Sequence, residues 1–265
     1  MPYRRVLSTL GCAEMGLPES MALAGRHGLD GVELRAAAGT LDLPLYLGKT
    51  YGTPAALERQ LPEAGARIPI LDTSLSLGAN TPADRAALLE FVPWAEGLGV
   101  PWLRVFDGDC AAGRPGENQA RETIQWWREL RHQQGWTVDC VVETHDSLLD
   151  ANLIMHFVAG SPGTKILWDT HHTWKRRGED PLATWRAIRP HVVHLHVKDS
   201  VSRPNADFPF TYVPPGQGEF PMAPLVGALR EEFTGVVCLE WERLWHPDLA
   251  PLDTALAAAA AARWW

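Results

Sequence analysis

The sequence lacks several features that would each indicate a particular class of protein. Its 265 residues include only four cysteines, and no two of them have the C-x-x-C spacing of a zinc or redox motif. We therefore expect buried thiols rather than disulfides or zinc ligands. No apolar run is long enough for a signal peptide or a membrane-spanning helix. This absence predicts a cytoplasmic protein with no membrane partner.

Positive charge is also scarce, because 24 basic residues face 32 acidic ones and the net charge is −8. The basic residues are scattered, with clusters only at Arg4-Arg5 and Lys175-Arg176-Arg177. Such a surface repels a phosphate backbone, so no nucleic-acid partner is expected. The turn after the first predicted strand, Leu10-Gly11-Cys12-Ala13, also lacks the G-x-G-x-x-G pattern of a dinucleotide-binding sheet.

Short apolar runs alternate with longer amphipathic segments along the whole chain, which is typical of a parallel sheet with crossover helices. We predict eight strands, at residues 6–10, 31–34, 68–72, 102–105, 138–143, 165–169, 192–196 and 236–240. One helix is predicted over residues 84–98, after a Thr81-Pro82 cap. Residues 40–52 and 200–220 are interpreted as loops. Eight units with nothing left over indicate a single (β/α)8 TIM barrel spanning residues 1–265.

Four consecutive predicted strands end in an acid or a histidine. Active sites of TIM barrels lie at the carboxyl ends of the strands, and neighbouring strands are about 4.8 Å apart. Alone, each of these residues is more often a salt-bridge partner than a ligand. Four uncompensated polar groups at one barrel mouth would be costly, and a shared cation removes that cost. The sequence thus predicts one divalent metal ion, preferably Mn²⁺, Mg²⁺ or Co²⁺ with Zn²⁺ as an alternative, held by Glu143, Asp169, His196 and Glu240.

The motifs around these residues resemble those of a known family. They are Glu143-Thr-His145, Asp169-Thr-His171-His172, His194-Leu-His196-Val-Lys198-Asp199, Pro215-Gly-Gln-Gly-Glu219 and Leu239-Glu240-Trp-Glu242. Together they are similar to the xylose-isomerase-like TIM-barrel superfamily of sugar phosphate isomerases and epimerases. That superfamily includes hydroxypyruvate isomerases, ketose 3-epimerases, inosose dehydratases and endonuclease IV. The resemblance implies the same four metal ligands, and it places His172 where the epimerases have a substrate-contacting histidine.

Two positions depart from the ketose 3-epimerase pattern. Ser202 stands where those enzymes have an arginine, and Leu149 stands where they have a glutamate. The resemblance therefore implies the broader function of a metal-dependent isomerase or epimerase acting on a small sugar or sugar-like hydroxy-carbonyl compound.

Such a reaction moves a proton on carbon next to a carbonyl or hydroxyl group, through an ene-diolate that a metal ion stabilises. Glu143 and Glu240 come from the ends of the four-strand arc, so we assign them proton transfer as well as metal binding. His172, Lys198, Glu33 and His145 are predicted to bind the small carbohydrate substrate. For Lys198 the alternative is a buried salt bridge with Glu240 or Asp199, and for Glu33 it is a structural hydrogen bond.

Three other functions compete with this one. An inosose-type dehydratase would use the same metal and base to expel water. An endonuclease IV-like repair enzyme would need extra histidines after the third and fourth strands, where the sequence reads Asp72-Thr-Ser and Phe106-Asp-Gly-Asp109. A non-catalytic sugar-binding barrel would give Glu143 and Glu240 no proton-transfer role. Trp126-Trp127 and Trp264-Trp265 leave a homo-oligomer open, because exposed tryptophan is unusual; the terminal pair can instead fold back.

Overall fold

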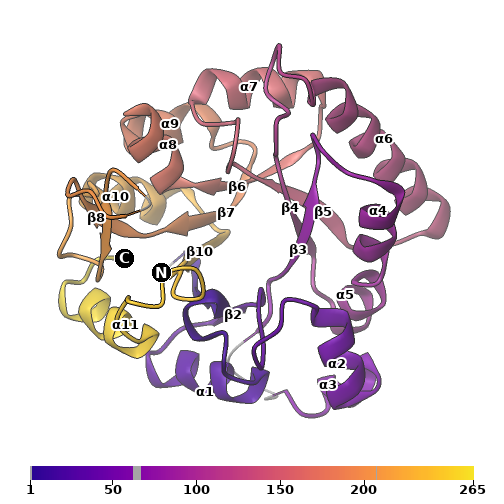
Figure 1. Ribbon diagram of the computed structural model, residues 1–265, viewed down its shortest axis with the longest axis horizontal. Coiled ribbons are helices and arrows are strands. Elements are labelled where there is room, and N and C mark those ends of the chain that lie inside the picture. The colour runs from indigo at the N-terminus through magenta and orange to yellow at the C-terminus, as the bar shows by residue number, and fades with distance from the viewer. Residues whose placement is uncertain (1, 62–66, 207) are drawn as a thin grey trace.

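Eight parallel strands form one continuous sheet in the computed structural model, which describes residues 2–61, 67–206 and 208–265. Isolated bridges from Gly31 to Arg67 and from Leu34 to Leu71 join the two outermost strands and close the ring. Helices surround the ring on its outside (Figure 1). The predicted (β/α)8 barrel is therefore confirmed. In ring order the strands are β2 (Gly31–Glu33), β1 (Arg4–Ser8), β10 (Val236–Leu239), β7 (Val192–Val197), β6 (Lys165–Asp169), β5 (Asp139–Glu143), β4 (Trp102–Phe106) and β3 (Ile70–Ser76).

The helices lie mainly between successive strands. In chain order they are η1 (Thr9–Cys12), α1 (Leu17–Arg26), α2 (Leu43–Tyr51), α3 (Pro54–Glu58), α4 (Pro82–Leu89), α5 (Val92–Leu98), α6 (Glu117–Gln134), α7 (Ala151–Gly160), α8 (Thr170–Arg177), α9 (Pro181–Ile188), α10 (Met222–Glu232) and α11 (Leu252–Ala261). Within the described ranges, none is both long and apolar enough to cross a bilayer.

Each strand alternates between an outward and an inward side chain, as the period of two requires. In β6, Ile166 and Trp168 belong to the large core between sheet and helices, whereas Leu167 packs with Ile70 and Val141 in a separate cluster. Two positions after each of these inward-facing apolar residues, toward the carboxyl end, the side chain is polar. Every strand contributes a buried polar residue: Ser8, Glu33, Glu143, Asp169, His196 and Glu240 lie at or next to the carboxyl ends, whereas Asp72 and Arg104 lie within β3 and β4.

Some predicted boundaries are wrong. The first strand ends at Ser8 rather than at residue 10, because the chain turns into η1, and the third runs over Ile70–Ser76. The helix predicted over residues 84–98 is two helices, since Pro93 lies in the first turn of α5 and has no N–H to continue the ladder of α4. The predicted Thr81 cap is confirmed, with its hydroxyl accepting from the Asp84 N–H.

Both long segments that we interpreted as loops contain regular structure. Residues 40–52 include α2, whose first turn is capped by the Asp42 carboxylate. Residues 200–220 include an antiparallel hairpin of β8 (Asp199–Val201) and β9 (Thr211–Val213). The three-residue strands of the hairpin, with many Pro and Gly neighbours, give little periodic signal, which explains why the hairpin was missed.

The tryptophan pairs pack within the chain. Trp264 and Trp265 are 8% and 4% exposed, so the terminal pair folds back. Trp127 is buried and donates its indole N–H to Asp139, and Trp126 lies partly buried beneath the Arg85 guanidinium. These contacts leave the homo-oligomer as a prediction that the two tryptophan pairs do not support.

Candidate metal centre

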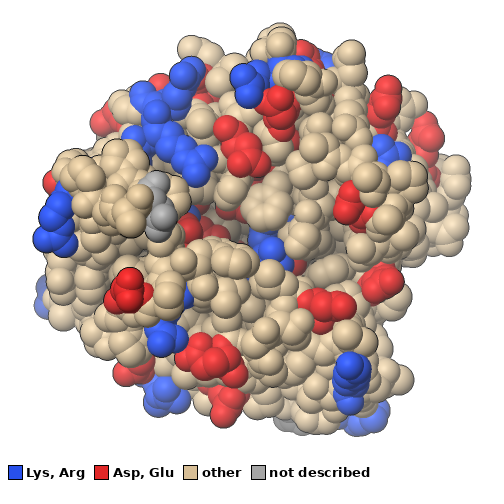
Figure 2. All heavy atoms as spheres, in the orientation of Figure 1, with Lys and Arg blue, Asp and Glu red and all other residues tan. Residues whose placement is uncertain are grey.

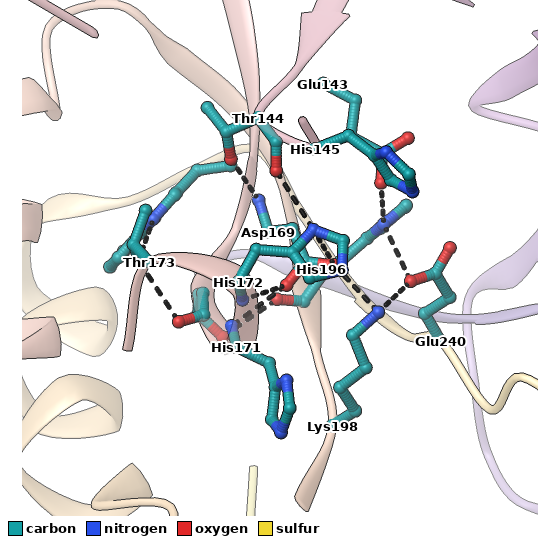
Figure 3. Close-up of polar contacts among 12 residues, drawn as sticks. Glu143, Thr144, His145, Asp169, His171, His172, Thr173, His196, Lys198 and Glu240 are labelled. Carbon is teal, nitrogen blue, oxygen red and sulfur yellow. Dashed lines mark hydrogen bonds and ion pairs between the residues drawn. The ribbon is translucent and has the colours of Figure 1, made fainter. Parts of the chain in front are cut away.

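The four predicted ligands meet at the carboxyl ends of the strands, at one end of the barrel (Figure 3). Each offers a ligand atom, and these atoms all lie within 4.8 Å of one another. They come from the neighbouring strands β5, β6, β7 and β10, so Glu143 and Glu240 stand at the two ends of the arc. His196 lies between them, with Nδ1 3.3 Å from Glu143 Oε1 and 3.3 Å from Glu240 Oε2.

The imidazole of His196 is oriented by Glu33. His196 Nε2 lies 2.8 Å from Glu33 Oε2, so Nε2–H donates and the lone pair remains on Nδ1. Nδ1 is buried and has no hydrogen-bond partner within the described part of the chain. Nδ1 faces two carboxylates, so it needs positive charge beside it, either a proton or a metal ion.

The charges around His196 favour such a cation. Burial opposes charge on this imidazole, but the carboxylates of Glu240, Glu33 and Glu143 outweigh burial and hold its pKa well above the ordinary value. Positive charge at Nδ1 is therefore stabilised, whether a proton or a metal ion supplies it. Three carboxylates and one imidazole suit a divalent ion of the Mn²⁺, Mg²⁺, Co²⁺ or Zn²⁺ type, and the residues present fit that group.

The Asp169 carboxylate has one oxygen engaged and one directed at the site. Oδ1 accepts from the backbone N–H groups of His171 and His172, both at 2.9 Å, and so caps α8. The Asp169 N–H in turn donates to the Thr144 hydroxyl. Burial raises the pKa of Asp169 to about 6, although Lys198 opposes the shift. The cap fixes the side chain so that Oδ2 faces the other candidate ligands.

Lys198 forms the buried salt bridge that the sequence left open. Its ammonium lies 2.8 Å from Asp169 Oδ2 and also bonds Glu240 and Glu242. These carboxylates outweigh burial and hold the Lys198 pKa well above its usual range. Asp199, the other partner considered, accepts instead from backbone N–H groups of the turn after β9.

The other predicted substrate-binding residues lie at different depths in the mouth of the barrel. His172 donates from Nδ1 to the Thr144 carbonyl, and burial, with Lys198, holds its pKa well below normal, so the ring is neutral. His145 lies at the rim; burial opposes its charge, but the Asp146 hydrogen bond and the nearby carboxylates together raise its pKa to about 9. Glu33 faces His194 and His196 rather than the open side of the site.

A cavity of about 80 Å³ opens onto this site, and Figure 2 shows the same face hollowed at its centre, where charged side chains meet. A larger hollow of about 740 Å³ is lined by Arg4, Pro69 and Pro101, at the opposite ends of the strands, where TIM barrels do not place chemistry. The small cavity is therefore the candidate substrate site. Its lining consists of Leu10, Arg35, Arg104, Phe106, Glu143, His145, His172, Glu240, Glu242 and Trp245.

Two arginines in this lining were missed from the sequence. Arg104 is 1% exposed and lies 3.4 Å from both Asp72 Oδ2 and Glu143 Oε2, over the Phe106 ring. A charged residue in the middle of the apolar run Trp102–Phe106 was a signal that could have found it. Arg35 follows Glu33 by two positions and so lies on the same side of the chain as that residue.

We expect Glu33→Gln to weaken binding of Mn²⁺ or Co²⁺ by about 10–100-fold, because groups that orient a metal-ligating histidine typically have effects of that size. Competition with a chromophoric chelator measures the affinity. The exposed Glu14, which pairs with Arg243, provides the matched control Glu14→Gln. Unchanged metal affinity in Glu33→Gln would show that this carboxylate has no role in metal binding.

The structure is similar to several solved barrels. The probable 3-DHS dehydratase AsbF of Bacillus anthracis aligns with TM-score 0.77 and 20% identity over 97% of this chain and 98% of that one. An IolI protein with a bound zinc atom aligns with TM-score 0.73 and 18% identity, covering 98% and 96%. A D-tagatose 3-epimerase-like protein gives 0.68 and 14%, covering 98% and 96%. These structural similarities show that the chain shares the fold of these barrels.

No curated protein matches the chain in sequence. The model of the family described as the xylose isomerase-like TIM barrel, however, matches residues 21–265. The match includes all four candidate ligands and seven of the eight barrel strands, from β2 to β10. The chain therefore belongs to the xylose isomerase-like TIM barrel family.

Proposed function

We propose that this protein is a divalent-metal-dependent isomerase or epimerase of a small sugar or sugar-like hydroxy-carbonyl compound. One observation carries the proposal: two glutamates from opposite ends of the arc direct carboxylate oxygens at the same imidazole nitrogen, each at 3.3 Å, beside a buried cavity. Membership in a family of sugar isomerases and their relatives supports it, as does the bound zinc of the similar IolI protein.

Both glutamates are held in the form that removes a proton. Burial favours neutral Glu143, but Arg104 and His196 together outweigh burial and lower the pKa. His196 and Lys198 do the same for Glu240 and hold its pKa well below normal. Either carboxylate can therefore act as the base. In an isomerase the glutamate that accepts the proton returns it to the neighbouring carbon, whereas in an epimerase the other glutamate, in its protonated form, delivers a proton to the opposite face.

The other residues orient the substrate. When bound, a divalent ion supplies Lewis-acid stabilisation of the charge that develops on substrate oxygens. Neutral His172 presents Nε2 as an acceptor for a substrate hydroxyl, because Nδ1 is engaged with Thr144. The Lys198 ammonium stands beside Asp169 and Glu240, where it stabilises negative charge on the same oxygens. His145 and Trp245 border the entrance and restrict water.

Incubation of the metal-loaded protein in D₂O with ketoses, aldoses, inososes and hydroxy-keto acids tests the proposal. We expect one of these compounds to gain deuterium on the carbon next to its carbonyl group, visible by NMR, with no other change in mass. Protein stripped of metal should give no label. A panel that stays unlabelled, although some members bind, would contradict the proposal and favour a non-catalytic sugar-binding barrel.

A dehydratase is the second candidate, because the similar AsbF structure is described as a probable 3-DHS dehydratase. The same base would remove a proton, and a hydroxyl on the β-carbon would leave as water. The D₂O experiment distinguishes the two, since a dehydration product is lighter than its substrate by one water molecule.

A further inference from the structure

Arg35 occupies a fixed position at the mouth of the barrel, directly beyond β2. Its backbone N–H donates to the Thr9 hydroxyl at 2.9 Å, and the next N–H, of Ala36, donates to the same oxygen at 3.0 Å. These two bonds tie the turn after β2 to η1. The side chain is 5% exposed and lines the same cavity as Glu143 and Glu240.

The guanidinium of Arg35 has no counter-ion. Within the described ranges no carboxylate lies within 4.0 Å of it, and its one side-chain hydrogen bond runs from Nη2 to the Ser74 hydroxyl at 3.1 Å. Nη1 is buried without a partner. Burial and the nearby Arg104 lower the Arg35 pKa to about 10, so the group still carries its charge at neutral pH.

An unpaired buried charge is costly, and proteins normally pair it. Other buried cations at this site do have carboxylate partners: Arg104 has Asp72 and Glu143, and Lys198 has Asp169 and Glu240. Arg35 differs from both in that no carboxylate of the described residues lies within 4.0 Å of its guanidinium. The carboxylates of Asp72, Glu143 and Glu240 stabilise the charge of Arg35 only from a longer distance, so an anion that enters the cavity would be its direct partner.

We propose that Arg35 binds a carboxylate of the substrate, so that the compound acted on is a sugar acid or another hydroxy-carbonyl acid. This inference rests on the proposed function of the same site and narrows it. One unpaired guanidinium matches one negative charge, and its planar fork matches a carboxylate in bidentate geometry. A doubly charged phosphate would lie against Glu143 and Glu240 with a larger repulsion.

Titration calorimetry of Mn²⁺-loaded protein tests this assignment with matched pairs of probes, glucuronate against glucuronamide and quinate against quinamide. Glucose 6-phosphate against glucose tests phosphate. We expect each acid to bind at least about 10-fold more tightly than its amide, since a charge-assisted bidentate pair contributes more than a neutral one. Arg35→Met should remove most of this preference and leave amide affinity within about twofold. Arg35→Lys should keep part of it.

The exposed Arg114 provides the control variant Arg114→Met, which should bind like the unchanged protein. The amide arm separates Arg35 from the metal, because an acid held by the ion alone keeps its preference in Arg35→Met. Three results would each overturn the inference. They are an acid preference that persists in Arg35→Met, equal binding of acids and amides, and a preference for glucose 6-phosphate alone. If Arg35→Met does not fold, undiminished acid preference in Arg35→Lys would overturn it.

Different results would contradict the isomerase proposal and the assignment of Arg35 to a substrate carboxylate. Deuterium incorporation into neutral sugars but not acids would overturn the carboxylate assignment and leave the isomerase intact. Arg35-dependent acid preference without turnover of any compound would leave the assignment intact and contradict the isomerase.

Discussion

Asp169→Asn should purify with little of the divalent metal that the unchanged protein retains, and His196→Ala should do the same. The four candidate ligand atoms lie within 4.8 Å of one another, so each loss removes about a quarter of the coordination. The carbonyl oxygen of asparagine still caps α8, but the amide nitrogen that replaces Oδ2 carries no negative charge. We expect affinity to fall by more than the roughly 100-fold typical of outer-shell changes.

Elemental analysis of protein prepared without chelator measures this content. Asp253, which is exposed and pairs with His27 and Arg26, offers the matched control Asp253→Asn. Thermal unfolding with and without added Mn²⁺ gives an independent measurement, because an ion that binds only the folded chain raises the transition temperature. Metal content that survives the double variant Asp169→Asn with His196→Ala would contradict the site.

Glu143→Gln and Glu240→Gln should each lose net turnover by about 10²–10⁴-fold, the usual contribution of a general acid or base. Glutamine preserves shape and one metal-directed oxygen, so the two variants separate proton transfer from coordination. If one glutamate serves each face of the substrate, the variant lacking the acid should still exchange deuterium into unreacted substrate. NMR in D₂O measures turnover and exchange in the same sample.

Metal content must be measured for both glutamine variants, since a variant without metal says nothing about proton transfer. Glu231 is exposed on the last turn of α10, and Glu231→Gln provides the control. Full turnover in a metal-replete Glu143→Gln or Glu240→Gln protein would remove that glutamate from the mechanism.

The strands and the candidate ligands were readable from the sequence because both follow a short repeat. A period of two places every second side chain inside the barrel, and the polar residue that ends each apolar run marks its carboxyl end. Glu143, Asp169, His196 and Glu240 all follow this rule, and the structure brings them together.

What the sequence could not predict depends on contacts between distant segments. Glu33 and His196 are 163 positions apart, and only closure of the ring makes one the hydrogen-bond partner of the other. The missing counter-ion of Arg35 is likewise a property of the whole mouth, since it becomes visible only when every neighbouring carboxylate has been placed. The β8–β9 hairpin was missed for a local reason, because three-residue strands have no measurable period.

Lys198 also bears on the exchange of the divalent ion that we propose. Its ammonium pairs with Asp169 and Glu240, which are two of the four candidate ligands, and so compensates part of their negative charge. Repulsion among these carboxylates is therefore partly relieved even without a metal ion. We therefore expect the proposed centre to exchange one divalent ion for another without unfolding, so that the ion it holds follows the metals available around the protein.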